Sequence, residues 1–205
     1  MSKEHAYEVT VRWTGNTGSG TASYRSYDRD HDIVTDGKPT IEASADPAFL
    51  GNPQRWNPED LLVASLSQCH MLTYLSVCAR NGVIVTDYQD TARGVMREAP
   101  GNSGQFTEVV LHPVVAVADA AMTDKAAALH REAHETCFVA NSVNFPVRHV
   151  PSVRVAPSRP GALGSPGRRG AASGKGGAIV RRRSGASGDW PIAVPVAPLL
   201  SRGMT

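Results

Sequence analysis

The pattern of apolar and polar residues along this chain predicts five β-strands. Residues 7–14 alternate in polarity and are rich in β-branched side chains, as is typical of a strand with one buried face. A second strand is expected to bend near Asp30, and the segment Pro100-Gly101-Asn102-Ser103-Gly104 predicts the turn of a hairpin. Residues 41–56, which contain several Pro and Gly residues, are expected to form a long loop. The five predicted strands cover residues 7–14, 21–35, 83–98, 105–118 and 146–155.

A long apolar run in the middle of the chain has the marks of an α-helix. Asn57 can cap its start, and Pro58 occupies the first turn, where a missing N–H costs nothing. Glu59 and Asp60 lie near the positive end of the helix dipole, and Asn81-Gly82 is a usual helix stop. Because the run is apolar nearly all round, we expect this helix to be buried on most sides.

A second helix is expected from a Thr123-Asp124 cap to about Thr136. Together with the strands, the two helices predict an α+β fold in which the helices pack on an antiparallel sheet.

Composition divides the chain into two parts. Its 205 residues, 41% of them hydrophobic, suffice for one packed domain with an appendage. The net charge of +2 is uneven: residues 156–205 carry eight basic residues and one acidic residue, which leaves an excess of five acidic residues on the remainder. We expect a folded domain over residues 1–156 and a Gly/Pro/Arg-rich tail without stable structure over residues 157–205. The tail lacks interleaved aromatic residues, so nucleic acid is not expected as a partner.

The cellular location expected from the sequence is the cytoplasm. The polar N-terminus does not resemble a signal peptide, and the three cysteines have no regular spacing, so reduced thiols are expected. The apolar run at residues 61–77 is interrupted by Ser65, Ser67 and Gln68. A buried helix is therefore favoured over a membrane span.

Two cysteines carry the candidate chemistry. Cys69 lies inside the first helix, and Cys137 lies at the end of the second. A thiol held on a rigid helix can act as a nucleophile, and a second thiol within reach can close a disulfide, which together form the basis of a thiol peroxidase. Cys78 lies nine residues after Cys69, half a helical turn away, so packing is its expected role.

The motifs around Cys69 also carry a family resemblance. The Asn57-Pro58-Glu59 helix start, the cysteine ten residues after Glu59 and the order of the elements make residues 7–155 resemble the osmotically inducible protein C (OsmC) and organic hydroperoxide resistance (Ohr) superfamily. The resemblance implies an OsmC-like fold, with a buried central helix and an antiparallel sheet, that forms an intertwined homodimer and uses no cofactor. It also implies an antioxidant role in the response to oxidative stress.

In that family a thiol-dependent peroxidase reduces organic hydroperoxides. The resemblance assigns Cys69 as the cysteine that becomes a sulfenic acid and Cys137 as the one that forms a disulfide with it. A small dithiol or a cellular thiol would then reduce the disulfide. The chain departs from the resemblance at Phe138, where the well-studied peroxidases usually have proline.

The resemblance further assigns Glu59 the role of orienting an arginine beside the thiolate. Ten helical residues place Glu59 about 15 Å from its own Cys69, so it would serve the Cys69 of a partner subunit across an antiparallel helix pair. Arg25 and Arg29 are the expected arginines, on one face of the second strand with Tyr27, and Arg55 is a third candidate.

Two other functions fit parts of the sequence. A non-catalytic stress or binding protein could keep the same fold with a weakened site. Alternatively, His130, His134 and Cys137 follow i, i+4, i+7 spacing and could bind zinc together with Cys69.

Overall fold

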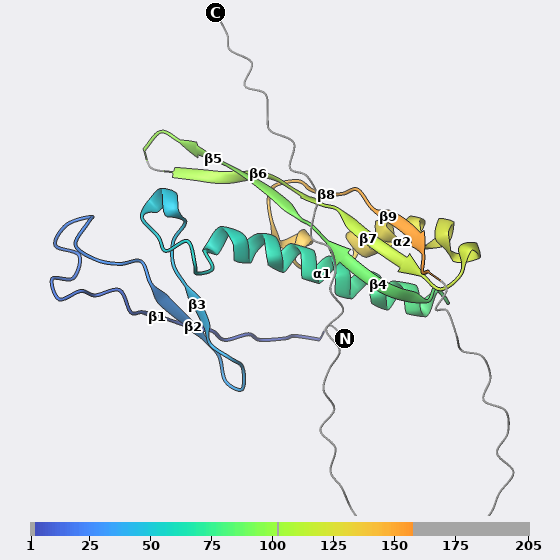
Figure 1. The fold of residues 1–205 in the computed structure, drawn as a ribbon, viewed down its shortest axis with the longest axis horizontal. Helices are drawn as coiled ribbons and strands as arrows, with labels where there is room; N and C mark the ends of the chain where they lie inside the picture. The colour runs from blue at the N-terminus through green and yellow to red at the C-terminus, as the bar shows by residue number, and fades with distance from the viewer. Residues whose placement is uncertain (1–2, 102, 158–205) are drawn as a thin grey trace, which may run out of the picture. The chain divides into compact units, whose positions relative to one another are not determined.

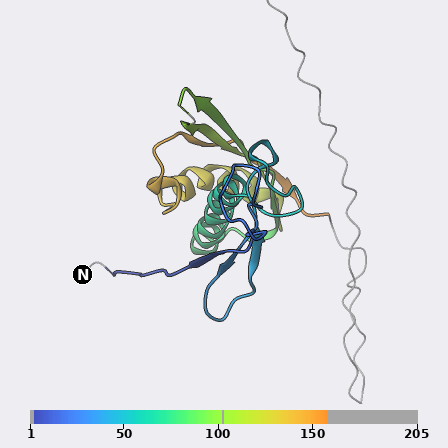
Figure 2. The same ribbon diagram turned by 90° about the vertical axis from the view of Figure 1, so that its left-hand side faces the viewer.

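The computed structural model describes residues 3–101 and 103–157, and every element in it belongs to one unit that spans Met1–Pro160. The tail predicted at residues 157–205 lies, except for Pro157, outside the described residues. Figure 1 shows the element order, with α1 running lengthwise along the strands β4 to β7, and Figure 2 shows α2 beside α1.

The central helix α1 (Pro58–Arg80) forms as its sequence predicts. The Asn57 side chain accepts a hydrogen bond from the Asp60 N–H at 2.7 Å, and Gly82 takes a positive φ of 70° just past the end. Burial is less complete than expected, because only one strip of the helix is fully covered: Leu66, His70, Tyr74, Val77 and Cys78.

α1 is also the one helix in the described part of the chain that is long and apolar enough to cross a membrane. Two of its polar side chains are nevertheless satisfied inside the protein. Ser67 donates to Asp90 at 2.6 Å, and His70 bonds to His130 at 3.0 Å. These contacts favour a core helix.

The second helix, α2 (Thr123–Glu135), packs antiparallel to α1. Residues 69, 70 and 74 of α1 contact residues 137, 130 and 126 in turn. As the residue number rises along α1, it falls along α2, so the two helices run in opposite directions. Thr123 is the first residue of α2 rather than its cap. Its hydroxyl instead donates back to Ala120 in a short 3₁₀ turn (Ala120–Met122), which Asp119 caps.

Within residues 3–101 and 103–157, nine strands form three sheets of three strands each. The first sheet has the order β1-β2-β3 and is antiparallel, whereas the other two combine antiparallel and parallel pairs. The strands of the first sheet are β1 (Thr10–Trp13), β2 (His31–Val34) and β3 (Ile41–Ala43). Those of the second are β4 (Val85–Asp90), β7 (Pro113–Val117) and β9 (Ser152–Val155), and those of the third are β5 (Arg93–Ala99), β6 (Ser103–Leu111) and β8 (Val147–His149).

The long hairpin predicted over residues 83–118 breaks in both arms at the same level, which divides it between two sheets. The Asp90 carboxylate accepts the His112 N–H at 2.6 Å, and Pro113 follows with no N–H to offer the ladder. Pro151 divides the last predicted strand into β8 and β9 in the same way. These two strands pair parallel to β6 and β7, so the expected all-antiparallel sheet is in fact mixed.

The predicted strand over residues 21–35 is wrong for its first half. Only His31–Val34 is extended, whereas residues 19–27 form turns held by the Ser26 hydroxyl, which donates and accepts within the loop. Residues 41–56 likewise contain β3 and a short 3₁₀ helix (Pro47–Phe49) within the expected loop.

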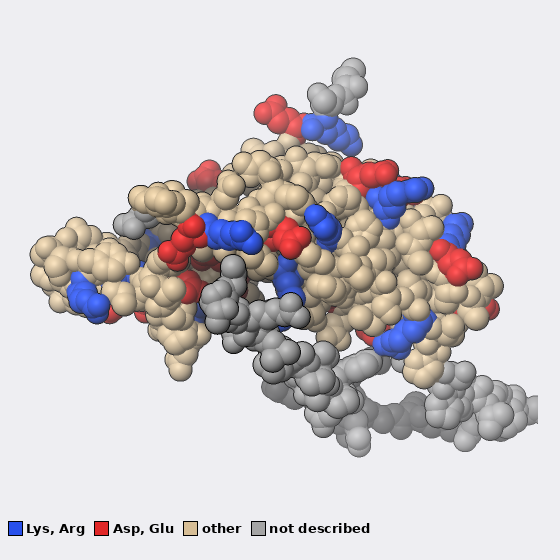
Figure 3. Space-filling view, turned by 90° about the horizontal axis from the view of Figure 1, so that it is seen from above, with Lys and Arg blue, Asp and Glu red and all other residues tan. Residues whose placement is uncertain are grey.

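Two apolar clusters form the core. One joins the C-terminal half of α1 to α2 and β7 through Tyr74, Val77, Cys78, Val115, Val117, Ala126 and Leu129, among others. The other joins Leu66 to Val109, Leu111 and Val147 of β6 and β8. On the face shown in Figure 3, basic and acidic side chains are interspersed, and no large area of one sign is visible.

Candidate active site

The two cysteines singled out by the sequence meet where α1 passes the end of α2. Cys137 Sγ lies 3.1 Å from Cys69 Sγ and is placed to donate its S–H to it, and both cysteines are free. Cys69 is partly exposed and Cys137 is fully buried. Burial raises the pKa of the Cys137 thiol to about 11, so this group stays protonated at neutral pH.

Cys69 opens onto an apolar cavity of about 660 Å³. We call this cavity the thiol groove. Two large side chains on its walls are exposed in the protomer, Leu72 at 60% and Phe138 at 84%. The groove is lined by Ser65, Gln68, Cys69, Leu72, Thr73, Ser76, Arg80, Thr136, Phe138 and Val139.

Four histidines lie together on the other side of α1. His70 and His130 are 1% and 0% exposed and are joined by the hydrogen bond between Nε2 and Nδ1. The ring centroid of His149 lies 5.6 Å from that of His70 and 5.2 Å from that of His134. Burial, with contributions from neighbouring histidines, lowers the pKa of His70 to about 4 and that of His130 to about 3, and burial lowers the pKa of His149 as well.

These contacts exclude the zinc site that the spacing of His130, His134 and Cys137 suggested. His130 turns toward His70, His134 faces His149, and Cys137 lies beyond the end of α2 against Cys69. Within residues 3–101 and 103–157, no three His, Cys, Asp or Glu side chains converge in a way that could hold a metal ion.

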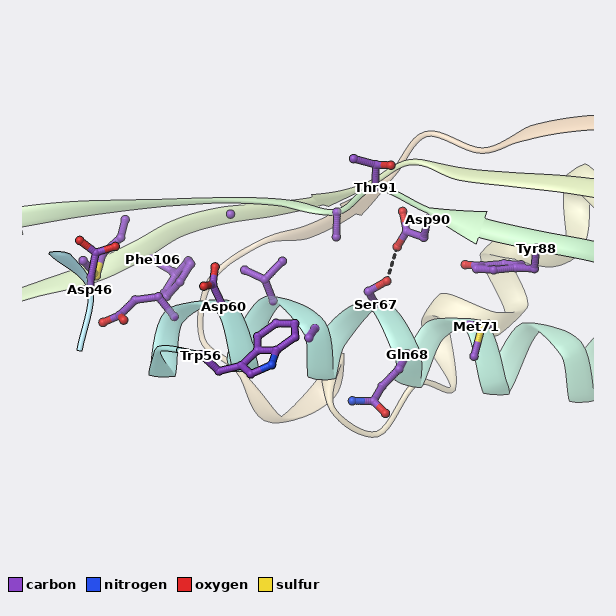
Figure 4. A pocket seen from close by; sticks show the side chains of 16 residues that line it. Asp46, Trp56, Asp60, Ser67, Gln68, Met71, Tyr88, Asp90, Thr91 and Phe106 are labelled. Carbon is purple, nitrogen blue, oxygen red and sulfur yellow. Dashed lines mark hydrogen bonds between the residues drawn. The ribbon is translucent and has the colours of Figure 1, made fainter. Parts of the chain in front are cut away.

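A second cavity, of about 710 Å³, lies between the N-terminal half of α1 and the strands β4 and β5 (Figure 4). The Ser67–Asp90 hydrogen bond joins α1 to β4 within this cavity's wall. Its wall includes Glu59, whose Oε2 is buried and has no hydrogen-bond partner among the described residues. The buried hydroxyl of Tyr88 likewise has no hydrogen-bond partner among the described residues.

The three candidate arginines differ in how they are held. Both terminal nitrogens of Arg29 donate to backbone carbonyls, of Tyr24 and Tyr27, and its guanidinium stacks 4.5 Å and 4.2 Å from the centroids of those two rings. The prediction that Arg25, Tyr27 and Arg29 share a strand face is therefore wrong, because the segment folds back on Arg29. Arg25 is exposed.

Arg55 lies in the loop that leads into α1. It pairs with Asp30 at 3.2 Å and with Glu42 at 3.8 Å, and its Nη1 is buried without a partner in the described part of the chain. The structure thus brings Cys69 and Cys137 together, whereas none of the described hydrogen bonds or ion pairs joins Glu59 to an arginine.

Only part of the histidine cluster could be predicted from the sequence. His130 and His134 share a helix and His70 precedes them, but His149 belongs to β8, and no local spacing connects it with the others. Its place follows from the parallel pairing of β8 with β6.

Comparison with known proteins agrees with this fold. The family described as OsmC-like protein matches residues 51–150, the segment that contains both Cys69 and Cys137. None of the curated proteins matches this sequence closely enough to count as a relative.

Solved structures extend the match to nearly the whole described chain. An OsmC-like protein of unknown function from Vibrio cholerae is 32% identical, with a TM-score of 0.64 over 72% of this chain and 99% of its own. An organic hydroperoxide resistance protein from Legionella pneumophila is 20% identical, with a TM-score of 0.54 over 73% of this chain and 98% of its own. One from Elizabethkingia anophelis is 18% identical, with a TM-score of 0.53 over 75% and 100%, and these two lower identities bear on the fold alone. The chain belongs to the OsmC-like family.

Proposed function

We propose that this protein is a thiol-dependent peroxidase that reduces organic hydroperoxides. The observation that carries the proposal is the 3.1 Å contact between Cys69, which opens onto an apolar cavity, and Cys137, which is buried behind it. A partly exposed thiol that can meet substrate, with a second thiol in contact behind it, fits the two steps of a two-cysteine peroxidase.

The reaction divides into two steps. In the first, the Cys69 thiolate attacks one oxygen of ROOH, the O–O bond breaks, and Cys69 becomes a sulfenic acid while the alkoxide takes a proton and leaves as ROH. In the second, the Cys137 sulfur attacks the sulfenic acid sulfur, and its proton leaves with the hydroxyl as water. The resulting disulfide is returned to two thiols by an external dithiol, which is itself oxidised.

The apolar lining of the thiol groove supports an organic hydroperoxide as the substrate. Apart from Arg80, the residues that line the groove carry no basic or acidic group, and they include Leu72, Phe138 and Val139. An alkyl or aryl group gains from burial against such a surface, whereas hydrogen peroxide has no apolar group to bury.

A homodimer would complete the site. Glu59 is about 15 Å from its own Cys69 along α1, yet an antiparallel pair of α1 helices crossing near Ala64 would place Glu59 of the partner subunit beside Cys69. The buried, unpartnered atoms of Glu59 and Arg55 support this arrangement, because Arg55 could then be oriented by Glu59 at the partner's thiolate. An exposed apolar row along β1 and the segment just before it also supports a covered interface: Tyr7, Val9, Val11 and Trp13.

Turnover of cumene hydroperoxide with dithiothreitol tests the activity. We expect Cys69→Ser to lower the rate more than about 100-fold, because the nucleophile is lost. Cys78→Ser is the matched control, since Cys78 is a buried thiol on the same helix that contacts Tyr74 and its neighbours. A Cys69→Ser protein that turns over peroxide like the wild type would refute the assignment, and a wild type without turnover would favour a non-catalytic OsmC-like binding protein.

Mixing two inactive variants tests the shared site. Heterodimers of Glu59→Ala and Cys69→Ser chains would carry one site with both residues intact and one with both lost. We expect the mixture to regain activity that neither parent shows, with heterodimers confirmed by native mass spectrometry. Confirmed heterodimers without any gain would place Glu59 in a purely structural role at the helix start.

A further inference from the structure

The thiol groove has a basic residue in its lining and no acidic one. Among the ten residues that line it, Arg80 is the only basic one. The remaining lining side chains are apolar, hydroxyl or amide groups. An isolated cation at the edge of an apolar groove favours a ligand that is apolar along its length and negatively charged at one point.

Helix geometry places Arg80 in line with Cys69. The two residues are eleven positions apart, which is about 20° from a whole number of turns and about 16 Å along the axis. Leu72, Thr73 and Ser76 occupy the strip between them. Long side chains on a helix lean toward its N-terminus, so the guanidinium extends back along the groove toward Cys69 and shortens that separation.

The Arg80 side chain is exposed and takes part in no hydrogen bond or ion pair within residues 3–101 and 103–157. A basic residue in the last turn also favours the helix dipole, but that effect needs no cavity. The helix dipole alone does not explain why Arg80 lies on the groove wall and in line with Cys69.

We propose that Arg80 is a specificity-determining residue that binds the anionic group of an amphiphilic hydroperoxide while the peroxide reacts at Cys69. This inference rests on the peroxidase activity proposed above. The apolar segment of the substrate lies over Leu72, with Phe138 and Val139 on the opposite wall. The anionic group is then about 10–16 Å from the peroxide, as set by the helical rise between the two residues.

A matched pair of substrates isolates the charge. We expect the wild type to reduce a long-chain hydroperoxide with a terminal carboxylate at a kcat/KM roughly three- to tenfold above that for its methyl ester, because a partly exposed charge pair contributes on the order of 1 kcal/mol. The advantage should lie mainly in KM. Arg80→Gln should abolish the acid-to-ester ratio, and Arg80→Lys should restore part of it. Arg131→Gln, which removes the same charge from an exposed position of α2, should leave the ratio intact.

Equal rates for acid and ester in the wild type would overturn the proposal, as would a ratio that survives Arg80→Gln or falls equally in Arg131→Gln. A change of oligomeric state in Arg80→Gln, measured by light scattering, would assign Arg80 to a subunit contact and would also overturn it.

Binding separates this inference from the peroxidase activity itself. We expect dodecanoate, which has no peroxide, to bind to the Cys69→Ser protein in calorimetry and to bind at least threefold more weakly when Arg80→Gln is added. That result without any peroxide turnover in the wild type would sink the proposed activity and leave the anion subsite standing. Equal dodecanoate binding with and without Arg80 would sink the subsite alone.

Discussion

The two sides of α1 belong to one helix but have different surroundings. On the side that faces α2 and the sheets, Leu66 and Tyr74 are 0% exposed, and His70 is closed in by three other histidines. On the side that faces the thiol groove, Leu72 is 60% exposed and Cys69 is accessible. The buried side holds α1 in the core, and the open side presents Cys69 to the groove. One helix therefore serves both stability and the proposed chemistry.

This difference also explains why Cys69 and Cys78, on one helix, have different expected roles. Cys78 is 1% exposed within the first core cluster, and burial raises the pKa of its thiol. Cys69 lies on the boundary between the two sides, where it meets both Cys137 and the groove.

Removing the buried Cys137 thiol should have the largest effect on peroxide turnover at Cys69. In Cys137→Ser, the sulfenic acid of Cys69 has no partner, so repeated peroxide should drive it to sulfinic acid. We expect turnover to cease after the first cycles and the intact mass to rise by about 32 units. Sustained turnover by Cys137→Ser at the wild-type rate would show that another thiol resolves Cys69.

Acid should selectively weaken the buried side. The folded protein keeps His70 and His130 neutral, with pKa values of about 4 and about 3, whereas unfolded histidine takes up a proton below about 6.5. The stabilisation is therefore complete above pH 6.5 and is lost as the pH falls toward 4.

We expect the free energy of unfolding to decrease by about 2–5 kcal/mol between pH 7 and pH 4.5, measured by urea titration. His130→Gln should have a flatter profile over the same window, whereas exposed His5→Gln should not. A flat wild-type profile would mean that the histidines titrate normally.

Truncation of one leucine on each side compares the two directly. Leu66→Ala should lower the free energy of unfolding by about 3 kcal/mol, because Leu66 is fully buried against β6 and β8. Leu72→Ala should cost less than about 1 kcal/mol and should instead raise KM for an organic hydroperoxide. Equal losses of stability from the two changes would show that the groove side is closed in solution.

Local signals predicted the central helix and the class of fold. The Asn57 cap, Pro58 and Gly82 fix the limits of α1 by backbone chemistry alone, and the structure confirms them. The breaks in the long hairpin were not predicted, because they depend on the contact between Asp90 and His112, which lie on the two paired arms. Pro113 and Pro151 were the available local signals, since each removes a donor that an unbroken ladder would need.

The site residues that depend least on tertiary contacts were the ones that the sequence could predict. Cys69 lies within α1 and Cys137 lies just after the end of α2, at positions that the sequence predicts, and the structure brings their sulfurs together. The arginines do not follow this rule, because Arg29 folds into its own loop through Tyr24 and Tyr27. His149 was missed because only the pairing of β8 with β6 brings it to the cluster.

Intact-mass analysis of the full chain after one equivalent of cumene hydroperoxide tests the central claim most directly. The account predicts a loss of about two mass units and, after proteolysis under non-reducing conditions, a single cross-linked peptide that joins Cys69 to Cys137 while Cys78 stays free. An unchanged mass, a disulfide that includes Cys78, or oxidation of Cys69 without a cross-link to Cys137 would contradict it.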